Sequence, residues 1–522
     1  MIIPLSTFDF LTRAARLFPE RIAVVDKDKR FTYSELLRRS DNLNEGLREL
    51  GVRSGDVVSV LNYNTHHMLE LYFGLTKTGY VINPLNFRYS AEDILAMINR
   101  VRSKVVVVHE QFLPMFEEIK SRLSSIEHVI VIEGSSNQER EYLPYEKLTQ
   151  DFRPSRFHEE TDENALAEIL FTSGSTSKPK VVGLTNRNLY LNALYTIIAY
   201  RMTEEDSLLH VVPLFHANGG GTPQTITATG GKHVMLRKVE VEEMLKLVEG
   251  ESITMFVAVP TVLKRFLSHP DFSSFDLTSL RRIIVVGTAL SQELYTEVES
   301  KIKNCECISA YGMTETGPLV ALAKLKQEEK KLERVEQLRL RTRTGYQILG
   351  AEVKIEPSQG SDEGEIFVRG NSVFNGYLGD MESDNDVFET GWFHTGDWGR
   401  KYQDGWFAIV DRVKDMIKSG GENISSTEIE ETLRNHPSVA ESAVISIPDK
   451  EWGEVPMAFV VLKPNSSSTK EDLREFCRNR LAHFKVPKSI EFLDSLPRTA
   501  NGKILKNNLR SRHWSGSGKK IN

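Results

Sequence analysis

A stretch rich in hydroxyl side chains, "FTSGSTSKPKVVGLTN" at residues 171–186, could surround the oxygens of a phosphate group. It follows an apolar run at 166–171 and departs from the Walker A pattern, because no Gly-Lys-Ser/Thr follows four residues after its glycine. The donors would be hydroxyls, a glycine backbone and an ammonium group. They belong to Thr172, Ser173, Gly174, Ser175, Thr176 and Lys180. The alternative is a solvated Ser/Thr loop that carries lysines by chance.

A second stretch, "SAYGMTETGPL" at residues 309–319, places a hydroxyl beside a carboxylate. Glu315 offers the hard oxygen ligand that Mg²⁺ prefers next to substrate phosphates, and Thr314 offers a hydroxyl. The alternative is a turn between a strand and a helix in which Thr314 is the N-cap.

Two further stretches carry charged residues next to glycine turns. In residues 391–424, Asp397 lies between glycines and Arg412 ends a predicted strand, so a carboxylate and a guanidinium could bind the hydroxyls of a ribose. Near the C-terminus, Lys503 follows Asn501-Gly502, a dipeptide typical of hairpin tips. The alternatives are that Asp397 is an ordinary turn residue and that Lys503 is an exposed lysine that only aids solubility.

The elements that must position these side chains alternate between strands and helices. "RFTYSELLRRSDNLNEGLRELG" predicts a helix with Thr32 as N-cap and Glu35 three residues later. A helix is also predicted over residues 90–102. Strands are predicted at 56–61, 210–215, 253–260 and 280–287. This alternation predicts parallel α/β layers, with ligands bound by the loops that follow the strands.

The pattern changes from about residue 345, where short alternating strands with glycine turns predict a β-barrel-like region. After residue 412, about 110 residues have their own predicted helix at 427–434 and strands at 443–447 and 457–462. We therefore expect an N-terminal domain at 1–412, which includes the barrel-like part at 345–412, and a C-terminal domain at 413–522.

The composition restricts the class of protein. At 522 residues the chain is too long for a single core, and its net charge of -6 provides no global field that would attract nucleic acid. Three cysteines without a CxxC pair argue against a disulfide framework and a zinc site. No run approaches the roughly 18 apolar residues of a membrane span, and the N-terminus lacks the pattern of a signal peptide. We expect a soluble cytoplasmic protein.

Taken together and in this order, the four stretches resemble the adenylate-forming (ANL) superfamily of acyl-CoA synthetases, aryl-CoA ligases, luciferases and adenylation domains. "PLFHANGG" at 213–220 and "VVGTALSQEL" at 285–294 extend the resemblance over nearly the whole chain. It implies an α/β fold, with a large N-terminal domain of stacked sheets plus a β-barrel-like subdomain and a small mobile α+β C-terminal domain. It also implies an AMP-forming acid–thiol ligase that uses ATP, Mg²⁺ and coenzyme A. Such an enzyme converts a carboxylate to acyl-AMP and pyrophosphate, and a thiol then displaces AMP.

The resemblance implies a role for each matching residue. The loop from Thr172 to Lys180 would enclose the β- and γ-phosphates, Thr314 would contact the α-phosphate and Glu315 would hold Mg²⁺. Tyr311 would stack near adenine, Asp397 would bind the ribose hydroxyls, and Arg412 would sit beside them. Lys503 would bridge the carboxylate and the α-phosphate, which repel each other by about 1 kcal/mol at 4 Å in water. The remaining implied residues are His216 in the acyl pocket, Lys414 as the hinge, and Gly420, Gly421 and Glu422 in the thiol tunnel.

The sequence departs from the family pattern at several positions. Ser177 and Val181 replace glycines of the phosphate loop, Asn186 replaces a frequent histidine, and Val286 and Thr288 replace small residues. Because valine tolerates positive φ poorly, these departures leave open a stiffer loop or an impaired nucleotide-binding homologue.

Two related activities share the first step of the reaction, namely an acyl-AMP ligase that loads a carrier-protein thiol and a luciferase-like oxygenase. For the acid, a glycine-rich stretch at 218–221 and apolar Phe256, Val259 and Ala310 favour a fatty or other hydrophobic compound. The expected partners are small molecules, namely the acid, ATP and CoA, without nucleic acid or a membrane span. We expect a monomer or homodimer.

Overall fold

The computed structural model describes residues 3–134, 142–150, 162–172, 179–288, 290–357, 361–379, 387–498 and 504–514. The chain forms two compact units. The first comprises Met1–Val353 and Val368–Phe393, and the second comprises Lys354–Phe367 and His394–Asn522. The β-rich region expected at 345–412 is thus divided between the units, and the expected boundary at 412/413 stays a prediction.

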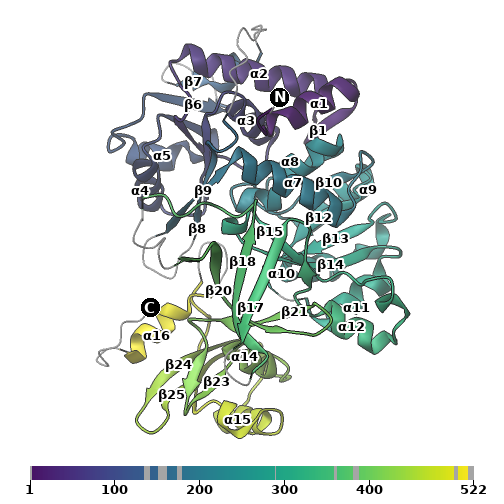
Figure 1. Ribbon diagram of the computed structural model, residues 1–522, viewed down its shortest axis with the longest axis vertical. Helices are drawn as coiled ribbons and strands as arrows, with labels where there is room; N and C mark the ends of the chain where they lie inside the picture. The colour runs from purple at the N-terminus through teal and green to yellow at the C-terminus, as the bar shows by residue number, and fades with distance from the viewer. Residues whose placement is uncertain are drawn as a thin grey trace. The chain divides into compact units, whose positions relative to one another are not determined.

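The first unit contains a seven-stranded sheet, mostly parallel, seen in Figure 1. Its order is β7 (Leu143–Pro144), β6 (His128–Ile132), β5 (Val105–His109), β3 (Val57–Leu61), β4 (Val81–Pro84), β8 (Leu166–Thr172) and β9 (Lys180–Thr185). The strands from β7 to β8 pair in parallel, and β9 runs antiparallel to β8. Apolar residues of α2 (Tyr33–Glu49), α3 (His66–Thr76) and α6 (Tyr145–Thr149) pack on one side, and those of α4 (Ala91–Val101) and α5 (Leu113–Lys120) form a separate core.

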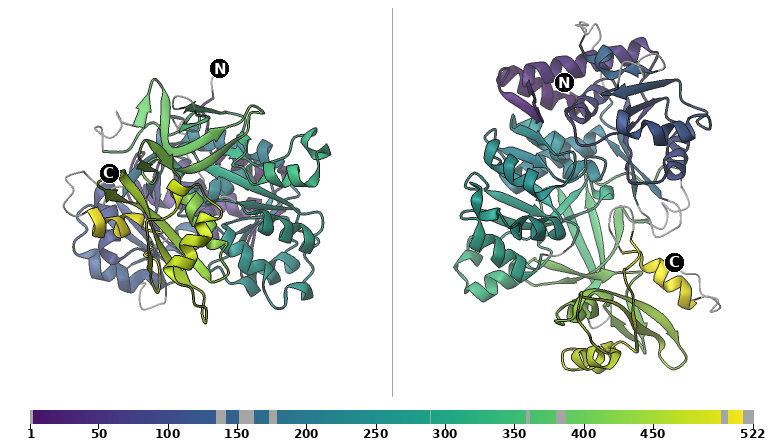
Figure 2. Two further views of the ribbon diagram at one scale, coloured as in Figure 1. Left: turned by 90° about the horizontal axis from the view of Figure 1, so that it is seen from below. Right: turned by 180° about the vertical axis from the view of Figure 1, so that it is seen from behind.

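The first unit also contains a nine-stranded sheet. Its order is β16 (Tyr346–Gln347), β15 (Leu319–Leu322), β14 (Glu306–Gly312), β13 (Arg282–Val285), β12 (Met255–Ala258), β10 (Ser207–His210), β11 (Lys232–Met235), β1 (Ile22–Asp26) and β2 (Lys29–Thr32). The strands from β1 to β14 pair in parallel. Helices α9 (Val241–Gly250), α10 (Pro260–Leu267) and α11 (Gln292–Lys301) contribute to its core, and the view from behind in Figure 2 shows them beside this sheet. The other helices of this unit are α1 (Phe8–Leu17), α7 (Asn186–Tyr200), α8 (Ala217–Thr229) and α12 (Arg334–Arg341).

Two five-stranded sheets remain. One has the order β17 (Ala351–Pro357), β18 (Glu363–Gly370), β20 (Trp392–Lys401) and β19 (Phe388–Glu389), with β21 (Phe407–Arg412) on β20. The other lies wholly in the second unit, with the order β23 (Glu422–Ile424), β22 (Ile417–Ser419), β25 (Gly453–Leu462) and β24 (Val439–Asp449), and β26 (Ser489–Phe492) on β25. Helices α14 (Ser426–Arg434) and α15 (Lys470–Arg478) share its core, and α16 (Lys506–Trp514) contributes Leu509 to a second one.

Most of the predicted elements are present. Thr32 and Glu35 form a reciprocal capping box at the start of α2, and Thr469 caps α15 in the same way. The predicted strand at 210–215 is wrong beyond its first residue, since β10 ends at His210. The side chain of Asn64 donates to the carbonyl oxygens of His210 and Val212, so this segment bonds to a distant side chain instead of a neighbouring strand. Among the described residues, no helix is long and apolar enough to cross a membrane.

Candidate active site

The two ends of the hydroxyl-rich stretch meet in the sheet. Thr172, the last residue of β8, and Lys180, the first residue of β9, are directly paired in the antiparallel register. The predicted donors Ser173, Gly174, Ser175 and Thr176 lie outside the described residues, as does Ser177. The strands therefore hold residues 172 and 180 as the two sides of one connection, the arrangement that a phosphate-enclosing loop requires.

One tyrosine joins the predicted cation to the predicted magnesium ligand. The Nζ of Lys180 lies 4.2 Å from the ring centroid of Tyr377, within range of a cation–π interaction. The hydroxyl of the same tyrosine donates to Oε1 of Glu315 at 3.0 Å. Tyr377 is only 8% exposed, and its backbone pairs with that of Val182 in an isolated bridge, so the residue is held beside β9. Sequence reasoning missed this residue, because nothing local in the sequence links it to the two stretches that it contacts.

The Thr-Glu stretch forms a short turn after β14. Residues Thr314–Thr316 form a 3₁₀ turn, and Thr314 is buried. The hydroxyl of Thr316 donates to the carbonyl oxygen of Pro318, and the backbone N–H of Phe374 donates to the carbonyl oxygen of Glu315. Together with the Tyr377 hydroxyl, these bonds hold both the backbone and the carboxylate of Glu315. A carboxylate so placed fits a magnesium ion that completes its coordination with phosphate oxygens and water.

The second unit brings Asp397 and Arg412 together. They are paired residues of β20 and β21, and Nε of Arg412 lies 2.8 Å from Oδ1 of Asp397. The Asp397 carboxylate is buried, whereas the Arg412 side chain is 39% exposed. An anchored carboxylate with an accessible guanidinium beside it can bind adjacent hydroxyls of a sugar.

Lys414, predicted as the hinge, and Gly420, Gly421 and Glu422, predicted for the thiol tunnel, lie farther along the second unit. Burial lowers the pKa of Lys414, while the neighbouring Asp415 acts in the opposite direction. Gly420 and Gly421 connect β22 to β23 with φ of +58° and +90°, a left-handed two-residue turn that glycine allows. Glu422 is exposed at the start of β23. The hairpin is well formed, and the roles of these residues stay predictions.

The remaining predicted residues are more widely distributed. His216 is the exposed N-cap residue of α8, and Tyr311 lies on β14 three residues before Thr314. Lys503 lies outside the described residues. The structure therefore brings together the ends of the loop, Lys180 and Glu315 in one unit, and Asp397 with Arg412 in the other.

Comparison with known proteins identifies the family. The AMP-binding enzyme family matches residues 11–378, and the AMP-binding enzyme C-terminal domain matches residues 428–503. This chain belongs to the AMP-binding enzyme family. It is 35% identical to the "Probable acyl-activating enzyme 12, peroxisomal" of Arabidopsis thaliana over 97% of this chain and 93% of that protein. It is 33% identical to the long-chain-fatty-acid–CoA ligase of Thermus thermophilus over 98% and 96% of the respective chains.

Solved structures of CoA synthetases have the same fold as this chain. The o-succinylbenzoate CoA synthetase of Bacillus subtilis, solved with its acyl-adenylate intermediate, is 30% identical, with a TM-score of 0.81 over 96% of this chain and 97% of that one. The same enzyme has been solved with ATP and a magnesium ion, at 29% identity, a TM-score of 0.81 and coverages of 96% and 98%. The predicted superfamily, fold, class of AMP-forming acid–CoA ligase and use of ATP, Mg²⁺ and CoA are thereby confirmed.

One departure from the family pattern has a simple structural explanation. Val181 lies within β9, paired with Phe171, and has no positive φ. Its carbonyl oxygen accepts the backbone N–H of Leu378, and its side chain is buried. A valine at this position is therefore an ordinary strand residue and imposes no backbone strain. Phe256, predicted to line an acyl pocket, is instead fully buried and packs edge-on against Phe266 in the core.

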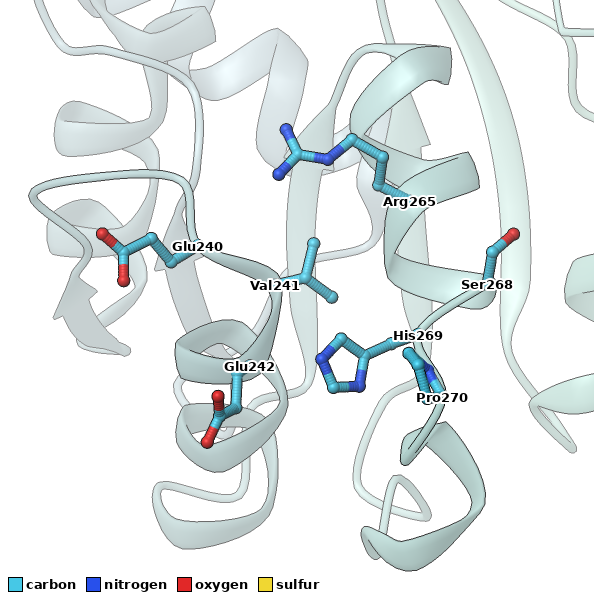
Figure 3. A pocket seen from close by; sticks show the side chains of 7 residues that line it. All are labelled: Glu240, Val241, Glu242, Arg265, Ser268, His269 and Pro270. Atoms are coloured by element: carbon cyan, nitrogen blue, oxygen red, sulfur yellow. The ribbon is translucent and has the colours of Figure 1, made fainter. Parts of the chain in front are cut away.

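Two other polar features lie apart from these AMP-binding residues. Figure 3 shows an open pocket whose side chains come from the start of α9, from α10 and from the turn after it, and it includes none of the predicted site residues. Within the described part of the chain, His66, His67 and Glu146 have potential ligand atoms within 4.8 Å of one another. Both oxygens of Glu146 already accept hydrogen bonds from Arg39, so a guanidinium occupies the position that a metal would need.

Proposed function

We propose that this protein is an ATP-dependent acyl-CoA synthetase that activates a fatty or other hydrophobic carboxylic acid. The acid would attack the α-phosphate of ATP to form acyl-AMP and pyrophosphate, and the thiolate of CoA would then displace AMP to form the thioester. The observation that carries the proposal is the shared contact of Lys180 and Glu315 with Tyr377. It supports a phosphate site in which a cation and a magnesium ligand have fixed relative positions.

The residues have separate tasks in this scheme. The Lys180 ammonium would neutralise phosphate charge at the loop, and its ring contact restricts where the amine can lie. The Tyr377 hydroxyl would orient the Glu315 carboxylate. Bound Mg²⁺ would supply a Lewis acid that offsets charge on the phosphoryl oxygens. Preorganised charges of this kind are worth most where negative charge develops in the transition state.

The second unit would contribute the sugar contact and the mobile lysine. Asp397, held by Arg412, would accept the ribose hydroxyls. Lys503 would compensate the charge of the carboxylate and the α-phosphate during adenylation and would then leave, with rotation about Lys414 bringing Gly420, Gly421 and Glu422 to the thiol. His216 would adjust the acyl pocket between the two steps.

The support for a hydrophobic acid comes from the glycines after His216 and from Val259. Gly219, Gly220 and Gly221 add no side chains at the start of α8, and Val259 is a partly exposed apolar residue just after β12. The relatives differ in their acids, since they include "Benzoate--CoA ligase, peroxisomal" and "Butyrate--CoA ligase AAE11, peroxisomal" of Arabidopsis thaliana. A cytoplasmic location is part of the proposal, although several relatives have peroxisomal names.

The deciding experiment is ATP–pyrophosphate exchange across a panel of carboxylic acids, followed by AMP release with and without CoA. We expect exchange with hydrophobic acids and CoA-dependent AMP release. Glu315→Gln should reduce exchange by about 100-fold, as expected for loss of a transition-state electrostatic contact. Glu306→Gln, in the preceding strand β14 but outside the site, is the matched control. ATP binding without exchange for any acid would refute the proposal, and AMP release only with a carrier protein would change the thiol acceptor.

The mobile lysine is tested separately. Lys503→Ala should remove acid-dependent exchange, while thiolysis of supplied acyl-AMP survives. Equal loss of both steps would contradict the assignment of this lysine to adenylation alone.

A further inference from the structure

Two buried histidines lie close to α8, on neighbouring parallel strands. His210 ends β10 and His233 is in β11, and their exposed fractions are 2% and 0%. The rings are nearly parallel, with centroids 5.2 Å apart, and Nε2 of His210 lies 2.9 Å from Nδ1 of His233. A buried imidazole pair of this kind needs a partner for every polar atom, because an unmet hydrogen bond there costs about 1–3 kcal/mol.

The partners define a single hydrogen-bonded chain. The Thr222 hydroxyl donates to the carbonyl oxygen of Gly219 at 3.0 Å and lies 3.4 Å from Nδ1 of His210. At the other end, Oγ1 of Thr227 lies 2.9 Å from Nε2 of His233. Because the Thr222 proton is directed to Gly219, its oxygen accepts the Nδ1 proton of His210.

With the Thr222 proton directed to the Gly219 carbonyl, this order assigns one tautomer to each ring. His210 carries its proton on Nδ1, so its Nε2 accepts from Nδ1–H of His233, and Nε2 of His233 accepts from the hydroxyl of Thr227. Each donor and each acceptor is used once when both rings are neutral. Burial lowers the pKa of His210 to about 3 and that of His233 as well, so both rings stay neutral throughout the neutral pH range.

The chain ends at an unusual backbone segment. Gly219, Gly220 and Gly221 have φ of +56°, +82° and +74°, and the backbone N–H of Gly219 donates to the carbonyl oxygen of His216 at 2.9 Å. Three adjacent glycines have little intrinsic preference for one conformation, so side-chain contacts must select it. The Thr222 hydroxyl is such a contact, and the Nδ1 side of His210 is the second partner of its oxygen.

We propose that His210 and His233, acting through Thr222, are positioning residues that fix the turn from His216 to Gly221 and so determine which carboxylic acids the enzyme selects. The inference rests on the proposed function, because it assigns this turn to the acyl pocket. It differs from a purely structural role in predicting a change confined to the acid substrate. ATP binding should be unaffected, since the contacts of Lys180 and Glu315 with Tyr377 involve neither histidine.

The test is Thr222→Val, which keeps the shape of the side chain and removes the hydroxyl. Thr225→Val is the matched control, since Thr225 is equally buried in α8 and its hydroxyl donates to a helix carbonyl, that of Thr222. Pyrophosphate exchange is measured with straight-chain acids from acetate to palmitate. We expect Thr222→Val to change the ratio of kcat/KM between long and short acids by roughly tenfold, with KM for ATP unchanged, and Thr222→Ser to restore the ratio. Equal ratios in the Thr222→Val and Thr225→Val variants would overturn the inference.

A direct measurement covers the case in which Thr222→Val folds poorly. Nitrogen-15 NMR of histidine-labelled wild-type protein, with His210 and His233 assigned by substitution, should show two neutral imidazoles protonated at Nδ1. Protonation at Nε2 in either ring would overturn the assigned order. The two proposals fail differently. Absence of acid-dependent exchange in the wild type refutes the proposed function, whereas exchange with an unchanged acid ratio refutes only the role of the histidine pair.

Discussion

Glu168 gives the sharpest prediction about stability, because its carboxyl group is buried beside a hydroxyl instead of a cation. It lies in β8, four residues before Thr172, and is fully buried. The hydroxyl of Tyr72 lies 3.5 Å from Oε1 of Glu168 and also donates to the carbonyl oxygen of Leu214 at 2.7 Å. Burial raises the pKa of Glu168 from 4.5 to about 8, so the folded protein keeps this group protonated at pH 7.

The direction and the size of the pH effect on stability follow from proton linkage. Above pH 4.5 the unfolded chain loses this proton and the folded chain retains it, so stability falls as pH rises from 4.5 to about 8. The loss is about 1.4 kcal/mol per pH unit, or about 3 kcal/mol by pH 7. Glu168→Gln removes the titration. The variant should therefore gain stability relative to the wild type with increasing pH, whatever fixed cost the buried amide adds.

The assay is urea unfolding from pH 5 to pH 8, followed by hydrogen exchange of peptides from residues 162–172. A local probe is needed because a chain with two compact units is not expected to unfold in one step. Glu205→Gln is the control, since the Glu205 side chain is 76% exposed and its substitution should leave the pH dependence unchanged. A difference between Glu168→Gln and wild type that stays constant with pH would refute the reasoning.

Three further predictions concern other contacts. Tyr377→Phe keeps the ring beside Lys180 but removes the hydrogen bond to Glu315. Pyrophosphate exchange should therefore slow by about tenfold, with little change in KM for the acid. An unchanged rate of exchange would contradict the role of the hydroxyl. Asp411→Asn replaces with an amide the carboxylate that accepts the backbone N–H of Ser426 at the start of α14. The second unit should lose about 1–2 kcal/mol of stability, measured by thermal melts. His210→Phe should remove a loss of stability that the wild type shows in acid. Burial lowers the pKa of His210 to about 3, so the free energy of unfolding of the wild type falls by about 1.4 kcal/mol per pH unit as the pH falls below 6.5. Urea unfolding from about pH 4.5 to pH 6.5 measures this difference.

Elements whose stabilising contacts lie between residues close in the sequence could be predicted from the sequence. The capping box of Thr32 and Glu35 predicts the start of α2 because both partners lie within one turn. The order of the motifs predicts the family and the fold, because it spans the whole chain. Contacts between distant segments were not predictable. Asn64 bonds to the segment after His210 that the apolar run predicted as a strand, and Tyr377 joins Lys180 to Glu315 without any neighbouring motif.

Contacts between distant segments also restrict where the predicted hinge at Lys414 can lie. Asp411 accepts hydrogen bonds from the backbone and hydroxyl of Ser426, and Asp415 forms a buried ion pair with Arg510 at 2.6 Å. Both partners belong to the second unit, so the residues on either side of Lys414 are bound to the same body. A rotation about Lys414 itself must therefore release Asp411 from α14. If the bonds of Asp411 persist through both half-reactions, the chain must turn before Asp411. The contacts of this aspartate, more than the identity of residue 414, thus determine where a hinge can lie.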